Sequence, residues 1–383
     1  MHTISARLLF AGVGLAALAG LQTPASAQGV TLLGVACSTP PPVHCPATAC
    51  PGATITNSGN ATDPKTGRNY FLDYPCDLKP NEKVTLVLNL HGGGSLGNWQ
   101  RHYFPIMDFK EKYRLVVITP DAGVTPEGKS NPANGTWSPT TDDQHIRNIV
   151  EQVEGAVGKQ NIKAFWLAGH SFGGQTSNRF IMTDPFFTER VDGWVSLSGG
   201  RLGSKRADVR ATIPNQGPPR AAAAPGAAAT PAAGAAPPRA PGAAPPAGGP
   251  PGGGGAMIDA SILPEKPFSF IYEAGDHEWT HKGVPKESKW AQKLGCGAQP
   301  TTPRQVVDTK AGYVYDSSRQ GDTANRIWGF LPRPGTANIW EYPGCKDGRV
   351  VADITRLDKG HTEGLEPAIT EEIVKLMISA KSP

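Results

Sequence analysis

The sequence lacks the features that define several classes of protein. Its 37 Lys and Arg residues and 33 Asp and Glu residues are well mixed, so the formal net charge is only +4. There is no basic cluster of the kind that nucleic-acid binding requires, so no nucleic-acid partner is expected. Beyond residue 27, no apolar run is long enough to span a bilayer. The remaining chain of about 350 residues is enough for one large α/β domain or two average domains.

The first 27 residues have the pattern of a signal peptide. Arg7 precedes the apolar run LLFAGVGLAALAGL, and small residues follow at Ala25 and Ala27. We expect cleavage after Ala27, which predicts a secreted or periplasmic protein with no stable insertion in a membrane. An uncleaved membrane anchor is the alternative.

All six cysteines follow the expected cleavage site, and an even number of cysteines in an exported chain predicts disulfide bonds. The simplest pairing joins Cys296 to Cys345. The other four allow three connectivities, which the sequence leaves open; they are Cys37, Cys45, Cys50 and Cys76. His44 lies among three of these thiols, but the irregular, proline-rich spacing disfavours a metal site, and we predict none.

From residue 84 the sequence alternates between strand and helix patterns. Nearly continuous apolar runs, typical of parallel strands covered on both faces, occur at residues 84–90, 114–120, 163–169 and 193–199. Residues 268–276 and 350–361 each have the pattern of a strand followed by a loop. Helical patterns occupy residues 98–113, 142–157 and 172–183 and begin again near Pro367. We therefore predict an α/β fold, with a doubly wound, mainly parallel sheet and helices on both of its faces.

A low-complexity segment interrupts this pattern. Residues 214–256 are almost entirely Ala, Pro and Gly, with too little apolar bulk to offset the entropy of ordering them. Because strand patterns resume after it, we interpret the segment as a disordered insertion within one domain. The predicted organisation is a Cys- and Pro-rich extension over residues 28–68 and a catalytic domain over residues 69–383.

The segment AGHSFGGQTS contains the spacing G-x-S-x-G, centred on Ser171. It lies between a strand pattern and a helix pattern, which is the context of a nucleophile elbow. The small residues Gly169, Gly173 and Gly174 suit the sharp turn that such an elbow requires. We predict that Ser171 is a nucleophile; an idle serine in a glycine-rich turn is the alternative.

A serine nucleophile needs a histidine base and an acid that orients the base. The partners are expected in the order serine, acid, histidine. Of the three histidines after Ser171, His361 lies in a loop after the last strand pattern, whereas His277 and His281 come too early. The segment FIYEAGDHE offers the acid. We favour Asp276, with Glu278 as the main alternative, and we place Glu273 within the strand.

Two backbone N–H groups are expected to stabilise the developing oxyanion. One belongs to Phe172, directly after the nucleophile. The other is assigned to Gly93 in the segment HGGG, with Gly94 as the alternative. Candidate substrate-binding residues are His170, Trp137 and Trp279, because aromatic side chains suit a planar acyl or sugar group.

These segments together resemble the α/β-hydrolase superfamily, and within it the secreted feruloyl esterases and polyhydroxybutyrate depolymerases. The resemblance rests on LNLHGGG, TTDDQHIRNIVEQV, GHSFGGQTSNRF and GHTEG, and it covers most of the chain after residue 69. It implies the α/β-hydrolase fold and a serine esterase with the catalytic residues Ser171, Asp276 and His361. Family members often continue the histidine loop with Trp-Pro, where this chain has GHTEGLEP, and the long insertion is foreign to the family.

The sequence thus predicts a secreted serine carboxylic ester hydrolase that acts through an acyl-enzyme and needs no metal or cofactor. The expected substrates are small or oligomeric esters, of soluble feruloyl, acetyl or hydroxyalkanoate type. Because peptide bonds can be cleaved by the same triad, a serine peptidase of this fold is one alternative. A non-catalytic α/β-hydrolase-like binding protein is the other.

Overall fold

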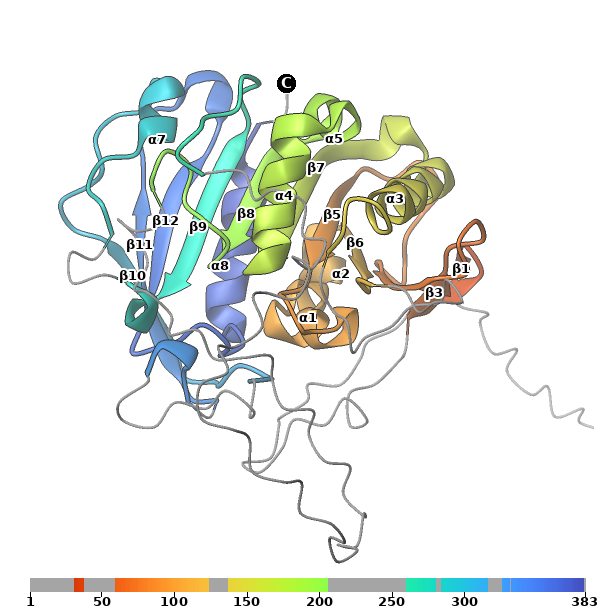
Figure 1. Cartoon of the computed structure of the whole chain (residues 1–383), viewed down its shortest axis with the longest axis horizontal. Coiled ribbons are helices and arrows are strands. Elements are labelled where there is room, and N and C mark those ends of the chain that lie inside the picture. The colour runs from red at the N-terminus through yellow and green to blue at the C-terminus, as the bar shows by residue number, and fades with distance from the viewer. Residues whose placement is uncertain are drawn as a thin grey trace, which may run out of the picture.

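The computed structural model describes residues 31–37, 59–123, 137–205, 260–279, 284–315, 326–330 and 332–381. Within these residues a ten-stranded sheet has the order β10-β11-β12-β9-β8-β7-β5-β6-β4-β3 (Figure 1). The strands are β3 (Asn60–Thr62), β4 (Asn69–Asp73), β5 (Val84–Leu90), β6 (Leu115–Pro120), β7 (Ile162–His170), β8 (Gly193–Leu197), β9 (Ser269–Gly275), β10 (Arg304–Asp308), β11 (Gly335–Glu341) and β12 (Val351–Leu357).

The six central strands are parallel, as the sequence predicts. Strands β12, β9, β8, β7, β5 and β6 are neighbours, and all the pairings among them are parallel. Every residue of β5, β6, β8 and β9 is buried. This burial explains why these segments are almost continuously apolar and do not alternate between apolar and polar residues.

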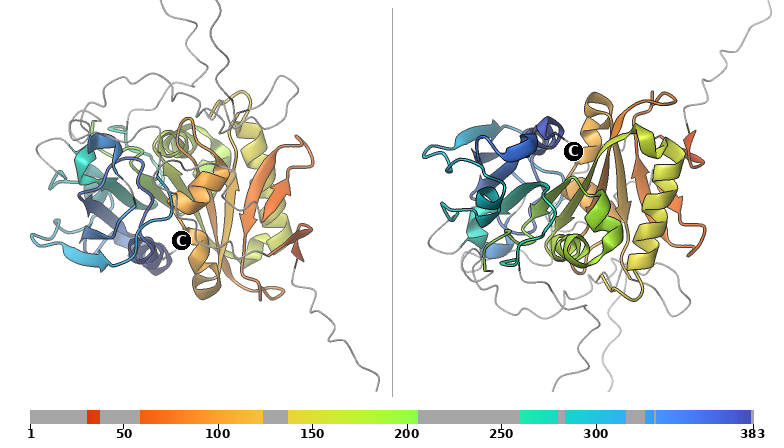
Figure 2. Two further views of the ribbon diagram at one scale, coloured as in Figure 1. Left: turned by 90° about the horizontal axis from the view of Figure 1, so that it is seen from below. Right: turned by 90° about the horizontal axis from the view of Figure 1, so that it is seen from above.

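Two separate hydrophobic cores cover the two faces of the sheet. Along β5, Leu86, Leu88 and Leu90 belong to one core, whereas Val87 belongs to the other, as the two-residue period of a strand requires. The first core includes buried residues of α3 (Asp143–Val157), α4 (Phe172–Thr183), α5 (Pro185–Arg190) and α7 (Lys289–Lys293). The second includes residues of α1 (Gly97–Tyr103) and α8 (Pro367–Ser379). Figure 2 shows these helix layers on either side of the sheet, which confirms the predicted doubly wound fold.

The edges of the sheet are antiparallel. Strands β10 and β11 extend the sheet beyond β12, and β4 and β3 extend it beyond β6. Residues 60–62 therefore pair within the same sheet, although the sequence assigns them to the N-terminal extension. A short hairpin of β1 (Thr31–Leu32) and β2 (Val35–Ala36) precedes them.

The helix predicted over residues 98–113 is divided into three short pieces. Helix α1 ends at Tyr103, a 3₁₀ turn η2 covers Ile106–Phe109, and α2 covers Lys110–Tyr113. Pro105 lies at the break, because proline lacks the N–H that would continue the helix. Further 3₁₀ turns are η4 (Lys159–Asn161), η5 (Asp276–Glu278), η7 (Arg326–Trp328) and η8 (Lys346–Gly348).

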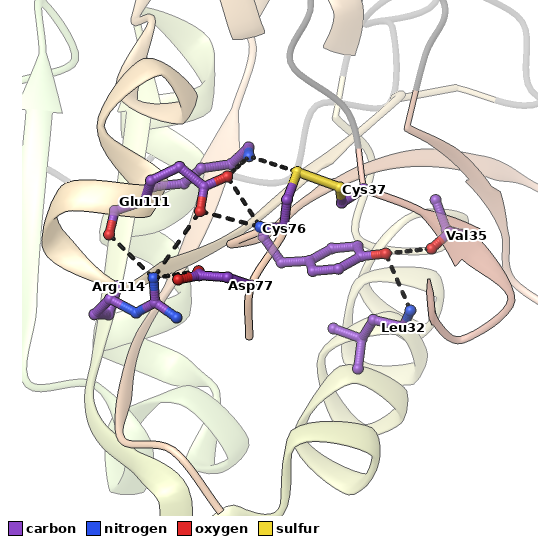
Figure 3. The surroundings of a disulfide bond; sticks show 9 residues. Leu32, Val35, Cys37, Cys76, Asp77, Glu111 and Arg114 are labelled. Atoms are coloured by element: carbon purple, nitrogen blue, oxygen red, sulfur yellow. Dashed lines mark hydrogen bonds and ion pairs between the residues drawn. A yellow bond between two sulfur atoms is a disulfide. The ribbon is translucent and has the colours of Figure 1, made fainter. Parts of the chain in front are cut away.

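Two disulfide bonds connect distant segments. Cys296 is bonded to Cys345, as the sequence predicts. Cys37 is bonded to Cys76, one of the pairings that the sequence leaves open. Figure 3 shows the disulfide between Cys37 and Cys76. Tyr74 reinforces this second link, because its hydroxyl accepts from the backbone N of Leu32 at 3.1 Å and donates to the Val35 carbonyl. The N-terminal hairpin is therefore fastened to the sheet by both a covalent bond and hydrogen bonds.

The described residues on either side of the Ala/Pro/Gly-rich insertion lie close together. The backbone N of Gly203 donates to the carbonyl of Ala260 at 2.7 Å, and β8 and β9, which flank the insertion, are paired in parallel. The insertion at 214–256 and the expected signal peptide both lie outside the described residues. Among the helices that are described, none is long and apolar enough to cross a membrane.

Candidate active site

Ser171 lies at a sharp turn between β7 and α4. Strand β7 ends at His170 and helix α4 begins at Phe172, so one residue makes the whole change of direction. Its backbone angles are φ 52° and ψ −114°, a conformation that residues other than glycine rarely adopt. The backbone N of Ser171 donates to the carbonyl of Leu197 on β8 at 2.8 Å, which fixes the turn against the next strand. This is the geometry expected of a nucleophile elbow.

Two glycines beside Ser171 are required by close contacts. A Cβ atom on Gly173 would lie 2.3 Å from the carbonyl oxygen of Leu90, and one on Gly169 would lie 2.5 Å from the backbone of Gly173. Both contacts are with main-chain atoms, which cannot move aside. Glycine at these positions allows helix α4 to start directly against β5 and β7.

The structure brings His361 to Ser171. Nε2 of His361 lies 2.8 Å from Oγ of Ser171, although 190 residues separate them in the chain. His361 follows β12 in the loop before α8, and its side chain is 3% exposed. The predicted nucleophile and base are therefore in hydrogen-bond contact.

The carboxylate beside the base belongs to Glu278 and not to Asp276. Oε2 of Glu278 lies 2.6 Å from Nδ1 of His361, and the Glu278 side chain is 2% exposed. Asp276 instead accepts a hydrogen bond from the backbone N of Lys359 at 3.2 Å, and its side chain is 37% exposed. The favoured prediction thus gives way to the alternative. The reason is the turn η5: its three residues per turn direct Asp276 and Glu278 to different sides of the chain.

Two further groups hold the Glu278 carboxylate. Its Oε1 accepts from Oγ of Ser198 at 2.6 Å and from the backbone N of Gly275 at 3.2 Å. Because an ionised carboxylate can only accept, Nδ1 of His361 must carry a proton. Nε2 of a neutral His361 is then left to accept the proton of Ser171, which is the tautomer that a general base needs.

The backbone carbonyl of His361 accepts hydrogen bonds from two aromatic side chains. His170 Nε2 donates to the carbonyl oxygen of His361 at 2.8 Å, and the Tyr103 hydroxyl donates to the same oxygen at 3.2 Å. The His170 ring lies 4.1 Å from the ring of Tyr103 and 4.7 Å from that of His361. His170 is 3% exposed and supports the backbone of His361, and its predicted substrate contact stays a prediction. Its position next to the nucleophile gave no sign of this support.

A buried ionic network underlies the histidine loop. Arg356 on β12 pairs with Glu273 on β9 at 2.6 Å, and its Nη2 donates to the Glu363 carbonyl at 2.9 Å. Lys359 pairs with Glu366 at 2.6 Å. Burial raises the pKa of Glu273 to about 7, and the guanidinium of Arg356 opposes this shift. The network fixes the loop from residue 359 to 366, and Glu273 lies within the strand as the sequence predicts.

The HGGG loop lies beside the start of α4. A Cβ atom on Gly93 would be 3.6 Å from Cβ of Phe172, so the two predicted oxyanion donors are adjacent residues in space. Gly94 is exposed, with φ +74°. His91 fastens the loop: its Nε2 accepts from the backbone N of Ala122 at 2.9 Å, and Nδ1 lies 2.8 Å from the Gly92 carbonyl. Burial lowers the pKa of His91 to about 4, so the ring is neutral.

The two tryptophans predicted to bind substrate are buried in this structure. Trp137 is 1% exposed and donates from Nε1 to the His91 carbonyl at 2.8 Å, so it supports the HGGG loop from within the core. Trp279 is 8% exposed and packs edge-on against Tyr272. Sequence reasoning missed Trp328, whose ring lies 5.5 Å from that of His361. No motif marks this tryptophan, because its role comes from the path of a distant loop.

The structure describes one of the other two histidines that follow Ser171. His277 Nε2 lies 2.9 Å from a carboxylate oxygen of Asp358, and His281 falls outside the described residues. Across the described part of the chain, no group of three or more His, Cys, Asp or Glu residues could hold a metal ion. The site therefore brings together a serine hydroxyl, an imidazole and a buried carboxylate, with the HGGG loop beside them.

Comparisons with known proteins give one family. The family model described as "Alpha/beta hydrolase family" matches residues 87–347, a range that contains Ser171 and Glu278 and ends before His361. A search of curated proteins found no match.

Several solved structures are similar to parts of the chain. A soluble variant of monoglyceride lipase from Saccharomyces cerevisiae is 18% identical, over 36% of this chain and 42% of its own, with a TM-score of 0.28. The fluorophosphonate-binding serine hydrolase F of Staphylococcus aureus is 19% identical, over 38% and 56%, with a TM-score of 0.27. Esterase 2 of Thermogutta terrifontis, phosphonylated by sarin, is 12% identical, over 42% and 60%, with a TM-score of 0.30. In each case this chain spans less than two thirds of the other protein's length.

Proposed function

Because the chain belongs to the alpha/beta hydrolase family, we propose that it is a secreted serine hydrolase of carboxylic esters. The observation that carries the proposal is the continuous contact from Ser171 Oγ through the His361 ring to the Glu278 carboxylate, at 2.8 Å and 2.6 Å. These three residues come from three separate loops. A strained serine, a buried imidazole and a buried carboxylate are costly for a fold to bring together. Together they form a catalytic relay in which the imidazole moves the proton and the carboxylate orients the imidazole.

The reaction follows from the positions of these groups. Ser171 Oγ attacks the ester carbonyl while His361 Nε2 takes its proton, and Glu278 stabilises the imidazolium that forms. The backbone N–H groups of Phe172 and Gly93 are assigned to the developing oxyanion. His361 then gives the proton to the leaving alcohol. Water attacks the acyl-enzyme in the second half of the cycle, with His361 again acting as the base.

Replacement of Ser171 tests this function. Ser171→Ala should abolish hydrolysis of p-nitrophenyl acetate, because no other described group is positioned to form the acyl-enzyme. Ser269→Ala is the matched control: Ser269 is also buried, but its hydroxyl accepts from the backbone N of Val350 at 3.0 Å and takes no part in the relay. Activity of Ser171→Ala near that of the wild type would refute the proposal, as would failure of a fluorophosphonate probe to label the wild-type serine.

For the substrate we propose a class and not a single compound: soluble feruloyl, acetyl or hydroxyalkanoate esters. A panel of methyl ferulate, acetyl-xylan and hydroxybutyrate oligomers would rank them by kcat/KM. Peptide bonds need the same catalytic groups, so a peptide library should be digested beside the ester panel. Faster turnover of peptides than of every ester would replace the esterase proposal with a peptidase.

Export is part of the proposal. The pattern of residues 1–27 supports it, and two disulfide bonds are consistent with an oxidising compartment. Expression of the full chain and N-terminal sequencing of the product found outside the cytoplasm would test it. A mature chain beginning at Gln28 is expected, and an intact chain retained in the cytoplasm would contradict it.

A further inference from the structure

Ser198 occupies an unusual backbone position next to the triad. It directly follows β8, and its φ is 55°, in the left-handed region that favours glycine. Gly199 and Gly200 follow it in the sequence, so glycine is readily accommodated in this turn. A serine in a strained position that glycine would fill more easily suggests that its side chain is needed.

The side chain of Ser198 points at the acid of the relay. Its Oγ donates to Oε1 of Glu278 at 2.6 Å, and both residues are 2% exposed. Oε2 of the same carboxylate faces His361 Nδ1 at 2.6 Å. A glutamate has three rotatable bonds before its carboxylate, so the backbone of η5 does not by itself fix the carboxylate plane. A donor on one oxygen turns the other oxygen toward the imidazole.

The same turn also holds the nucleophile. The carbonyl of Leu197 accepts from the backbone N of Ser171 at 2.8 Å, and the backbone N of Ser198 donates to the Glu273 carbonyl at 2.7 Å. Two consecutive residues at the end of β8 therefore contact the nucleophile elbow, the acid and strand β9. The distance between nucleophile and acid is set at this turn.

We propose that Ser198 is a positioning residue that orients the Glu278 carboxylate toward His361. The inference rests on the proposed function, because it assigns a role within that catalytic relay. The competing explanation is that the hydroxyl merely satisfies a buried polar group. The two explanations differ in whether loss of the hydroxyl affects kcat through Glu278 or affects folding alone.

Two variants of Ser198 separate these effects. Ser198→Ala and Ser198→Gly both remove the hydroxyl, but glycine also relieves the left-handed backbone. Both should lower kcat for p-nitrophenyl acetate by about tenfold to a hundredfold, the range expected for a hydrogen bond to a charged group. KM should change by less than about twofold, because the substrate contacts are untouched. Ser198→Gly should have the higher Tm of the two, and Ser269→Ala should keep wild-type kcat.

A double-mutant cycle with Glu278→Gln tests whether Ser198 acts through the acid. If it does, Ser198→Ala should cost little further activity once the carboxylate is absent, and a fluorogenic ester makes such low rates measurable. An equal loss in both backgrounds would overturn the inference, as would wild-type kcat in both Ser198 variants. Full activity of Ser171→Ala would instead refute the proposed function, so the two failures can be told apart.

Discussion

Replacing Glu278 with glutamine asks which carboxylate serves the base, because the change removes one charge and almost no volume. The surroundings dictate how the new amide must lie. The backbone N of Gly275 donates to Oε1 of Glu278 at 3.2 Å, and a backbone N–H can do nothing but donate. The amide oxygen is therefore expected to occupy that side, which places the amide NH₂ group against Nδ1 of His361.

That arrangement forces the wrong tautomer on the base. An NH₂ group donates to Nδ1, so the ring proton must move to Nε2, which faces Ser171 Oγ at 2.8 Å. A protonated Nε2 cannot accept the serine proton. In addition, the imidazolium formed during reaction loses its buried counter-charge. Loss of the acid from a triad by this route lowers kcat by about 10,000-fold, and we expect Glu278→Gln to approach that figure.

The assay compares Glu278→Gln with Asp276→Asn, which makes the same chemical change two residues away. Asp276 is 37% exposed and bonded to the Lys359 backbone, so its variant should keep kcat within about twofold of the wild type. Steady-state kinetics on p-nitrophenyl acetate, with circular dichroism to confirm folding, would decide. The assignment of the acid would be refuted if Glu278→Gln kept more than about a tenth of wild-type kcat. It would also be refuted if the kcat of Asp276→Asn fell as far as that of Glu278→Gln.

Three further predictions concern stability. Gly173→Ala should abolish activity and destabilise the protein by about 1–3 kcal/mol, because the new Cβ would lie 2.3 Å from a carbonyl oxygen of β5. Gly155→Ala is the control: its new Cβ would have no atom within 4 Å, so the Tm should not fall. Arg356→Leu should lower the free energy of unfolding, measured by urea titration, by about 3–5 kcal/mol, because Glu273 loses its buried partner. A loss below about 1 kcal/mol would show that the ionic network under the histidine loop is dispensable for stability. Burial lowers the pKa of His145 from 6.5 to about 4, so the unfolded chain binds the proton more tightly. The resulting stability is present above the unfolded pKa of 6.5 and is lost as pH falls toward 4, by on the order of 3 kcal/mol, and His145→Gln should flatten this dependence in denaturation curves.

The strand and helix that carry Ser171 could be predicted because buried elements have a clear pattern of apolar residues in the sequence. A strand is expected at residues 163–169 and a helix at 172–183, and the structure has β7 at Ile162–His170 and α4 at Phe172–Thr183. The sequence pattern does not predict the edge strands β3, β10 and β11. Strand β10 is mostly exposed, and β11 contains Gly, Thr and Asn, so neither has the apolar run that marks a central strand. At a sheet edge, pairing with the neighbour overrides weak propensity.

The identity of the acid could not be read from the sequence for a different reason. Parallel strands place their carboxyl ends at one edge of the sheet, so the segment after β9 was correctly expected near His361. Choosing between Asp276 and Glu278 requires the direction in which each side chain leaves the backbone. The 3₁₀ turn that sets those directions is closed by long-range bonds, such as His277 N to the Lys359 carbonyl at 3.1 Å. No local pattern encodes such a bond.

The position of Glu278 on a turn, and not at the end of its strand, has a consequence for how the relay is built. A carboxylate at a strand end is oriented by the sheet, whereas one on a turn must be oriented by side-chain and backbone donors. Ser198 and Gly275 supply those donors, and both belong to the ends of the neighbouring parallel strands β8 and β9. The sheet therefore still fixes the acid, but through hydrogen bonds to its carboxylate. For this reason, substitution of Ser198 should lower kcat more than substitution of another residue of η5 that leaves Glu278 in place.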